Sequence, residues 1–357
     1  IEGERILAIA QGDDAAALAA RAGERFDAGG AIVMPAFVNA HHHAYSNALR
    51  GTENAQPLEL WALFTVAWGR ALDGDLLRLA ILLGAAEMLR GGVASVIDHS
   101  PQVRLHETAF AAHAESGMRV GYAPMLHDLH DHDLLGFTLP APLRARIEGA
   151  GFPSHGFYAD MIAALVAAAG GSSRVRILIG PNAPQRCSPE LLTLWAGLRA
   201  RHGLGVHTHL LETRAQAIQA RRAWRDGIVA EMDRRGLLTP GLAVAHGVWA
   251  SEAERALLAA RGVVVVHNPS SNLMLGSGVM PYAGYAVHGA TIALGSDSAN
   301  TGGAADPFEL MRLAMMLPRV HQDPVAGFKP SSVEVLRMAT QGGARALGLG
   351  DQLGRIA

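Results

Sequence analysis

The sequence has little of several features that would point to particular classes of protein. Its 357 residues include one cysteine, Cys187, so the chain cannot form an internal disulfide or supply a cysteine-rich zinc site. The charges nearly cancel, with 30 Lys+Arg against 32 Asp+Glu, which removes the electrostatic case for binding nucleic acid or an anionic membrane. No apolar run approaches the roughly 20 residues that a membrane-spanning helix requires. We therefore expect a soluble, cytoplasmic globular protein.

The two ends of the chain resemble parts of an element that continues elsewhere. Ile1–Ala10 lacks the basic and long apolar segments of a signal peptide and is typical of a short strand pair around Gly3-Glu4. Gly350–Ala357 stops where another element would be expected to begin. We expect the chain to be a core that lacks parts of a flanking domain.

Short runs rich in Val and Ile alternate along the chain with longer Ala/Leu/Arg-rich stretches of helical spacing. Such alternation predicts repeated βα units and a parallel sheet. About eight strands over some 260 residues favour a TIM barrel. A doubly wound open sheet is the alternative, but no Gly-x-Gly-x-x-Gly follows the first strand. The predicted strands are Ala31–Val38, Val93–Ile97, Val120–Ala123, Val175–Ile179, Leu204–Val206, Leu242–Ala245, Val263–Val266 and Thr291–Leu294.

Two segments interrupt this pattern. Residues 53–74 look like an insertion over the mouth of the barrel, and residues 126–152, which contain the sequence HDLHDHD, look like a long loop. A metal bound by HDLHDHD is less favoured than a solvated loop. Long loops that follow barrel strands are commonly functional lids.

Polar residues follow six of the predicted strands at the C-terminal end, where barrel enzymes place their reactive groups. Side chains alternate along a strand, so His41 and His43 point to one side and His42 to the other. Two imidazoles in that arrangement can share one metal ion. The residues at the six strand ends are His41–His43, Asn182, His207–Glu212, His246, His267–Pro269 and Asp297.

A second His-x-His pair, His207 and His209, ends the fifth predicted strand, and its spacing does not choose between the two. His209 is nearer the strand end, where a metal held by His41 and His43 would lie. We therefore assign His209 as a ligand and His207 to a supporting or packing role. Asp297 supplies a carboxylate from the last strand, which lies beside the first in a closed barrel. Three nitrogens and one oxygen suit zinc, with Fe(II) and Mn(II) as alternatives.

The remaining strand-end residues suit proton transfer. A zinc site can lower the pKa of its bound water to about 7. Glu212, one loop turn beyond His209, could take that proton and deliver it to a leaving nitrogen. His246 could polarise the substrate or assist the attack, and Asp297 could also hold the hydroxide in line.

The motifs resemble those of the amidohydrolase superfamily. Met34–His43 resembles its first-strand signature, and four later segments are similar to motifs of one branch, namely Val206–Thr213, Ala245–Trp249, His267–Leu273 and Leu294–Asp297. That branch includes the cytosine-, guanine- and S-adenosylhomocysteine-deaminase-like enzymes and the s-triazine hydrolases. The resemblance runs in order from about residue 1 to the C-terminus. It implies a distorted (β/α)8 barrel, one divalent metal ion per chain and usually a homodimer.

The resemblance also implies a division of the chain and a set of roles. Residues 1–34 would form part of a terminal β-sandwich, 35–344 the barrel, and 345–357 the start of the return to the sandwich. The family pattern places the metal on His41, His43, His209 and Asp297, with Glu212 as proton shuttle and His246 as its partner. Binuclear members often bridge two metals through a lysine on the fourth strand. The single lysine here, Lys329, lies past the last strand, so one metal is expected.

Some positions depart from the pattern of these relatives. Ser46 stands where several deaminases of 8-oxopurines carry glutamine, and Leu60 precedes Trp61 where nucleoside deaminases tend to have an acidic residue. Both differences weigh against those substrates. Asn182 and Gln185 are candidates for reading the substrate ring, with a structural turn role about as well supported, and Trp61 is a candidate for stacking on the ring.

These observations predict a mononuclear metal-dependent aminohydrolase. It would deaminate an amino-substituted N-heterocycle of pyrimidine, purine, pterin or triazine type and release ammonia. One alternative is hydrolysis of a cyclic amide, or displacement of chloride or an alkylamine from a similar ring. The other is a binding protein that kept the barrel and lost turnover, against which the complete set of ligands, Glu212 and His246 argues.

Overall fold

A curved parallel sheet forms the centre of the computed structural model, which describes all residues except 53–54, 137, 150, 173, 322–328 and 357. Among the described residues, nine strands form one sheet in the order β8-β7-β6-β5-β4-β3-β2-β1-β9, with every neighbouring pair parallel. The strands are β1 (Phe37–His43), β2 (Val93–Ser100), β3 (Arg119–Leu126), β4 (Val175–Pro181), β5 (Gly205–Leu210), β6 (Leu242–His246), β7 (Val264–His267), β8 (Thr291–Leu294) and β9 (Asp297–Ser298).

The two edges of this sheet are joined by the chain itself. β8 leads through Gly295 and Ser296 directly into β9, and β9 pairs with β1 through His42 with Asp297 and His43 with Ser298. The connection from the eighth strand to the first closes the sheet, as in a barrel. This confirms the prediction of a distorted (β/α)8 barrel over a doubly wound open sheet.

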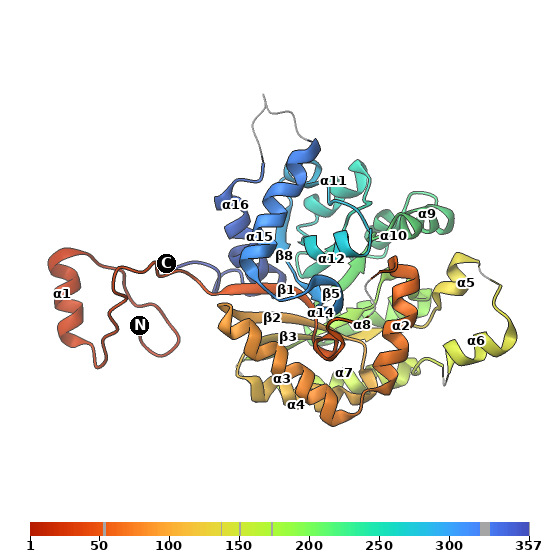
Figure 1. Ribbon diagram of the computed structural model, residues 1–357, viewed down its shortest axis with the longest axis horizontal. Coiled ribbons are helices and arrows are strands. Elements are labelled where there is room, and N and C mark those ends of the chain that lie inside the picture. The colour runs from red at the N-terminus through yellow and green to blue at the C-terminus, as the bar shows by residue number, and fades with distance from the viewer. Residues whose placement is uncertain (53–54, 137, 150, 173, 322–328, 357) are drawn as a thin grey trace.

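Helices follow most strands and pack around the outside of the sheet (Figure 1). Several begin with side-chain caps: the side chain of Asp73 accepts from the backbone N–H of Leu76, and Ser251 and Glu254 form a capping box. The helices are α1 (Gly12–Arg21), α2 (Leu58–Ala71), α3 (Gly74–Arg90), α4 (His106–Ser116), α5 (Asp131–Leu135), α6 (Ala141–Glu148), α7 (His155–Ala169), α8 (Pro189–His202), α9 (Arg214–Ala223), α10 (Ile228–Arg234), α11 (Glu252–Ala260), α12 (Pro269–Met274), α13 (Tyr282–Ala286), α14 (Ala299–Gly302), α15 (Pro307–Met316), α16 (Ser332–Arg337) and α17 (Gly343–Ala346).

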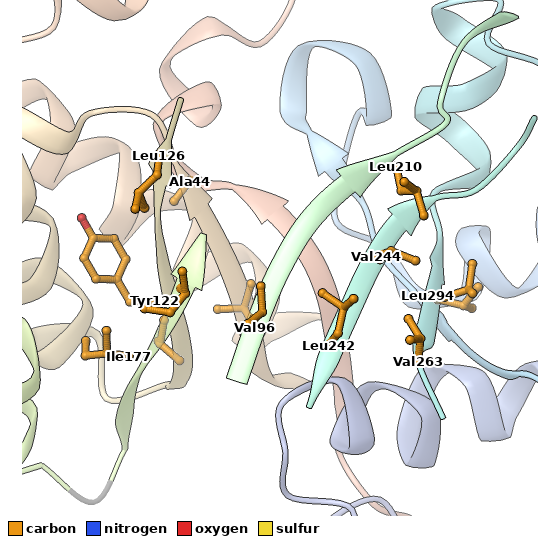
Figure 2. Close-up of a cluster of buried hydrophobic side chains, with 14 of the residues drawn as sticks. Ala44, Val96, Tyr122, Leu126, Ile177, Leu210, Leu242, Val244, Val263 and Leu294 are labelled. Carbon is orange, nitrogen blue, oxygen red and sulfur yellow. The ribbon is translucent and has the colours of Figure 1, made fainter. Parts of the chain in front are cut away.

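The strands bury apolar side chains on both faces. One buried cluster lies between the strands and the surrounding helices and includes Tyr122, Leu210 and Val244 (Figure 2). A second includes Ala40, Ile97, Leu178 and Val264 from the strands, together with Leu347 after α17. Strands covered on both faces read as continuous apolar runs, which is why the sequence signal for them is strong. The two clusters hold the strands rigidly, and with them the side chains at the strand ends.

The structure differs from the sequence-based expectation in several connections. The predicted helical stretch 214–235 is two helices, α9 and α10, which are separated at Gly227, whose φ of 88° lies in the left-handed region. The predicted insertion, residues 53–74, contains α2. The predicted loop 126–152 contains α5 and α6. β1 begins at Phe37 rather than at 31, and Ile32 and Val33, which come before it, are exposed.

Residues 1–34 form an arm that extends away from the barrel (Figure 1). Its helix α1 buries no residue, and an isolated antiparallel bridge joins Glu2 to Arg5 around Gly3-Glu4. All of residues 1–34 are described, and they contain no strand. The β-sandwich therefore stays a prediction. Among the described residues, no helix is both long and apolar enough to cross a membrane.

Candidate metal centre and active site

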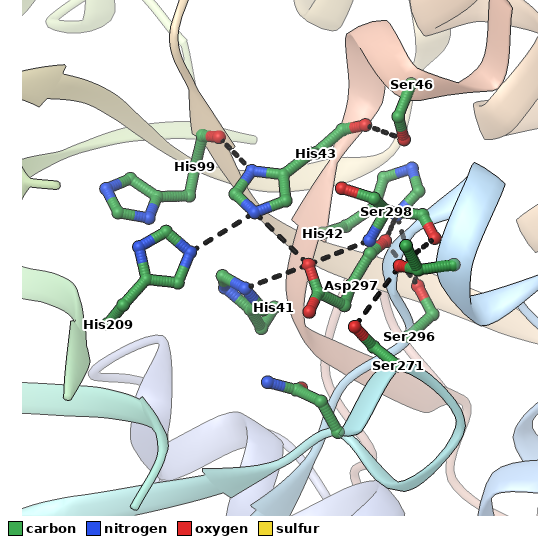
Figure 3. A network of polar contacts seen from close by, with 12 residues as sticks. His41, His42, His43, Ser46, His99, His209, Ser271, Ser296, Asp297 and Ser298 are labelled. Carbon is green, nitrogen blue, oxygen red and sulfur yellow. Dashed lines mark hydrogen bonds and ion pairs between the residues drawn. The ribbon is translucent and has the colours of Figure 1, made fainter. Parts of the chain in front are cut away.

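Four predicted ligands converge at the C-terminal rim of the barrel (Figure 3). His41 and His43 come from β1, His209 from β5 and Asp297 from β9. The Oδ1 atom of Asp297 lies 3.2 Å from Nε2 of His43 and 3.4 Å from Nε2 of His41. Nε2 of His209 lies 3.3 Å from Nε2 of His43. The structure brings these four side chains together around one point, and all four are buried.

A local irregularity in β1 helps to aim its histidines. The register between β1 and β2 shifts between Asn39 and His42, so β1 carries a bulge there. Neighbouring side chains of a regular strand point to opposite faces. Here Ala40 lies in the buried apolar cluster, and the next residue, His41, still points toward the metal centre. An extra residue in a bulge re-aims the side chains that follow it.

The outer nitrogen of each of these histidines is already bonded, which fixes the ring orientation. Nδ1 of His43 donates to the carbonyl oxygen of His99 over 2.5 Å, and Nδ1 of His209 donates to that of Asn182 over 2.6 Å. Nδ1 of His41 lies 2.7 Å from Nε2 of His207, the supporting position that the sequence suggested for His207. These partners leave each Nε2 directed at the common centre.

The atoms at the centre fit a divalent cation. Nε2 of His41 is buried and has no hydrogen-bond partner, although Asp297 lies within ion-pair distance of it. A buried polar atom without a hydrogen-bond partner destabilises the folded state unless another group, such as a metal ion, bonds to it. Imidazole nitrogens with one carboxylate form the donor set that zinc prefers.

Burial and charge set the protonation of these groups. Burial lowers the pKa of His41 to about 3 and holds the pKa of His209 well below its usual value. For His43, burial lowers the pKa, but the bond and charge of Asp297 outweigh it and the net shift is upward. Burial alone would raise the pKa of Asp297, but His41 and His43 hold it well below its ordinary range. Neutral imidazoles and an ionised carboxylate are the forms that bind a metal. The pKa shifts of His41, His209 and Asp297 favour those forms, whereas the shift of His43 opposes them.

Glu212 and His246 lie beside this centre. Nε2 of His246 is 3.6 Å from Oε2 of Glu212 and 3.7 Å from Oδ2 of Asp297. Nδ1 of His246 contacts Oδ1 of Asn272 at 2.8 Å, which directs Nε2 toward the two carboxylates. Burial raises the pKa of Glu212, against the opposing charge of His246, and the nearby Asp297 raises it further. A carboxyl group with a raised pKa is suited to both taking up and releasing a proton.

Two of these residues have a backbone conformation that L-residues rarely adopt. His246 has a φ of 77° and Asp297 a φ of 62°. Such positions cost about 1–3 kcal/mol each and cluster at functional sites. His246 is the last residue of β6 and Asp297 the first of β9, so both lie where the chain leaves or enters a strand at the rim.

A cavity of about 100 Å³ opens onto the centre, and its lining includes His43, His209, Glu212, His246 and Asp297. Of the candidates for substrate contact, Trp61 and Asn182 line it. Gln185 is not among its lining residues and is only 3% exposed. The structure therefore brings Trp61 and Asn182 to the site and leaves Gln185 in the wall behind it.

Several residues at the site were not singled out as site residues from the sequence. His99, at the end of β2, is fully buried, and its ring centroid lies 4.7 Å from that of His209. His41, His99 and His209 bring ring nitrogens within 4.8 Å of one another. The sequence did contain a signal for His99. Asp98-His99 follows the predicted strand Val93–Ile97, just as His209 follows the predicted strand Leu204–Val206. Asp131 accepts a hydrogen bond from Arg186, which lines the cavity. From the sequence, Asp131 lies in a segment that we interpret as a solvated loop.

Known proteins resemble this chain over nearly its whole length. The model of the amidohydrolase family matches residues 32–357. A 5-methylthioadenosine/S-adenosylhomocysteine deaminase of Syntrophobacter fumaroxidans is 34% identical over 339 residues, which are 94% of this chain and 72% of the relative. A 5'-deoxyadenosine deaminase of Methanothermobacter thermautotrophicus is 33% identical, with 90% of this chain and 70% of the relative covered.

Solved structures agree with this barrel. An adenosine deaminase from Xanthomonas campestris, with bound zinc, superimposes with a TM-score of 0.78 at 28% identity, covering 91% of this chain and 69% of its own. A guanine deaminase from C. acetobutylicum, with guanine in its active site, superimposes with a TM-score of 0.76 at 21% identity, covering 90% and 74%. At that identity, the second likeness shows the fold alone.

Proposed function

Because the chain belongs to the amidohydrolase family, we propose that it is a metal-dependent aminohydrolase acting on an amino-substituted N-heterocycle. The prediction of this superfamily is confirmed, and so is that of a hydrolase acting on C–N bonds, since the relatives at 33–34% identity are named deaminases. The observation that carries the proposal is the convergence of three imidazole nitrogens and Asp297 beside the Glu212–His246 pair.

His41, His43, His209 and Asp297 would hold one divalent ion, which we propose to be zinc, with iron and manganese as alternatives. The bound zinc of the Xanthomonas campestris deaminase and the donor set of this chain support that choice. When bound, such an ion supplies a positive charge that lowers the pKa of water and polarises it for attack.

The chain's own residues move the protons. Glu212 accepts a proton from the attacking water at one carboxylate oxygen and donates it to the departing amino nitrogen. His246, whose Nδ1 is held by Asn272, would use Nε2 to stabilise the negative charge that develops at the reacting carbon. Water adds to the amino-bearing carbon, the C–N bond breaks, ammonia leaves, and the ring gains an oxygen. The buried setting of Glu212 supports this role, since it keeps the pKa raised.

We also propose that the chain forms a homodimer, as its resemblance to the family implies. One face of α2 supports this: Leu60, Leu63, Phe64 and Trp68 follow one another at helical spacing and are each 47–51% exposed. Association of two chains would cover such apolar area. Light scattering on a sizing column measures the mass directly. The cytoplasmic location stays a prediction.

Ammonia release tests the main proposal. We expect ammonia from at least one member of a panel of aminated pyrimidines, purines, pterins and triazines, with activity proportional to metal content up to about one ion per chain. Loss of activity on chelation and its return with zinc would support the metal. A fully loaded protein that opens a cyclic amide, or releases chloride or an alkylamine instead of ammonia, would contradict the deaminase assignment.

A further inference from the structure

An ion pair closes the cavity wall on the side of β4. Arg186, at the end of the short 3-10 helix Pro184–Arg186 that follows β4, lines the cavity with a side chain that is 17% exposed. Its Nε donates to Oδ1 of Asp131 over 2.6 Å and its Nη2 to Oδ2 over 2.5 Å. This two-pronged pair matches the guanidinium charge with a carboxylate. This arginine therefore offers the cavity no unpaired positive charge.

The same arginine fixes the side chain of Asn182. Nη1 of Arg186 donates to Oδ1 of Asn182 over 2.6 Å. An arginine N–H can only donate, so the amide oxygen of Asn182 must face Arg186 and the amide nitrogen must face away from it. The Nδ2 atom reaches the sulfur of Met125 at 3.1 Å, which is a weak acceptor. Asn182 thus presents a hydrogen-bond donor, not an acceptor, to the cavity that it lines.

Backbone contacts hold this wall in place. The N–H groups of Asp128 and Leu129 both donate to the carbonyl oxygen of Arg186. The carboxylate of Asp128 in turn accepts from the backbone N–H and the hydroxyl of Ser188. The loop after β3 is thereby fastened to the loop after β4. These contacts help to position Asp131 and Arg186 on the cavity wall.

The cavity is also small. Its volume of about 100 Å³ is well below the roughly 300–1,000 Å³ of pockets that enclose drug-sized ligands. Glu59 of α2 accepts a hydrogen bond from the hydroxyl of Thr213 over 2.6 Å and is not among the lining residues. This space is closer in size to a single heterocyclic base than to a base that carries a sugar.

We propose, on the basis of the proposed function, that the site selects a free, uncharged heterocyclic base with a hydrogen-bond acceptor on the edge that faces Asn182. The acceptor is a carbonyl oxygen or an unprotonated ring nitrogen. Asn182 is the residue that determines this specificity, and Arg186 and Asp131 are positioning residues that keep its amide nitrogen turned to the cavity. This preference differs from the nucleoside substrates in the names of the relatives.

Matched pairs of bases and their ribosides test the size limit. Ammonia release is measured from cytosine and cytidine, adenine and adenosine, and guanine and guanosine, together with pterin and triazine amines, using protein loaded with zinc. We expect kcat/KM for the best base to exceed that of its riboside by at least 100-fold. A riboside that is used as well as its base would overturn the inference and leave the proposed function standing. No ammonia from any compound would overturn both.

Variants of Asn182 and Arg186 test the recognition. Asn182→Asp replaces the donor by an acceptor at constant shape and leaves the backbone carbonyl that holds His209. We expect KM for the best base to rise about 100-fold, with a much smaller change in kcat, because a buried polar group loses its partner. Arg186→Met releases the amide and should raise KM about tenfold, while Arg186→Lys should restore part of the loss because it keeps a donor but not the fork.

Arg144→Gln is the matched control. Arg144 pairs with Asp133 and Glu148 in the same loop region, is 45% exposed and does not line the cavity. Its KM should stay within twofold of the wild type. Metal content and melting temperature, measured for each variant, separate a change in recognition from unfolding. If Asn182→Asp and Asn182→Ala both keep full zinc and a wild-type KM, the assignment of Asn182 is wrong.

Discussion

Among the described residues, two groups of His, Asp and Glu side chains resemble metal sites, and they differ in almost every other respect. The rim cluster consists of His41, His43, His209 and Asp297 at the ends of β1, β5 and β9. The loop cluster consists of His132, Asp133 and Glu148 in and around α5 and α6. In the loop cluster, Nε2 of His132 lies 3.1 Å from Glu148 and 3.8 Å from Asp133. By residue type and spacing alone, either group qualifies.

The difference lies in what already satisfies the donor atoms. Arg144 donates to Asp133 over 2.8 Å and contacts Glu148 at 2.6 Å, so a cation of the chain itself occupies the loop cluster. Asp133 is 45% exposed, so water serves it as well. At the rim the atoms are buried, and Nε2 of His41 has no hydrogen-bond partner. A metal site needs donor atoms that no other cation of the chain already pairs with and that rigid elements hold in place. Of these two clusters, only the rim cluster meets both conditions.

Glu212→Gln should give the largest effect, because it removes the proton carrier beside the rim cluster and leaves the ligands. We expect kcat to fall about 10³-fold, within the range of about 10²–10⁴ for general acid–base groups. Steady-state ammonia release measures it, and zinc content should stay at the wild-type value. Glu148→Gln in the loop cluster is the matched control and should keep full activity. Wild-type turnover in Glu212→Gln would refute the proton shuttle.

Gly295→Ala should cause the next largest change, since the chain passes closely behind the rim cluster at this residue. An added Cβ would clash with Oδ1 of Asn268 and would lie 2.7 Å from Cβ of His41 and 2.9 Å from its backbone nitrogen. Such overpacking against backbone should cost about 3 kcal/mol in the free energy of unfolding and displace His41.

Gly136→Ala, at the end of α5 near the loop cluster, provides the comparison. The added Cβ meets nothing within 4 Å, but the φ of 71° is left-handed. Its cost should be about 1 kcal/mol. Urea unfolding of the apo and zinc-loaded forms measures both variants. Equal losses would mean that the rim is no more tightly packed than the loop.

Much of the barrel and the rim cluster was predictable from the sequence, and the reasons are physical. Strands buried on both faces produce Val/Ile runs that cannot be mistaken for loops, as at Val263–Val266. Side-chain alternation places His41 and His43 on one side without any knowledge of the rest of the chain. The C-terminal ends of the strands meet at one rim, so polar residues at those ends must be neighbours.

The cavity wall was not predictable in the same way. Arg186 pairs with Asp131, which lies 55 residues earlier in a segment whose polar sequence suggests solvent. No periodicity reports on such a pair, because each partner follows a different strand and only the packing of two loops joins them. The break between α9 and α10 covers residues 224–227, where Trp224 is extended and Gly227 has a positive φ, within an otherwise helical pattern. The exposure of Ile32 and Val33 depends on what covers them, which local sequence does not encode.

His207→Ala should have an intermediate effect, because it removes the side chain that orients a rim ligand. Nε2 of His207 lies 2.7 Å from Nδ1 of His41. Loss of such an outer partner typically weakens metal binding by about 10- to 100-fold. Competition with a chromophoric chelator measures the zinc affinity, and His132→Ala in the loop cluster should leave it unchanged. If His132→Ala lowers the zinc affinity and His207→Ala does not, the assignment of the two clusters is reversed.

Arg144→Gln should produce the smallest effect and addresses the loop cluster directly. Its two ion pairs are exposed, so each contributes little to the free energy of unfolding and weakens with salt. We expect the melting temperature to fall by about 2 °C or less at low salt and by less still in 1 M NaCl. The substitution also removes the cation that satisfies Asp133 and Glu148, so it is the change that would best free the loop cluster for a metal. A second zinc ion bound by this variant, measured by mass spectrometry of the native protein, would mean that the arginine alone separates the two clusters. If the variant binds no second ion, donor atoms on short exposed helices do not form a metal site even when no arginine pairs with them. The rigidity of the strands would then be the deciding difference between the two clusters.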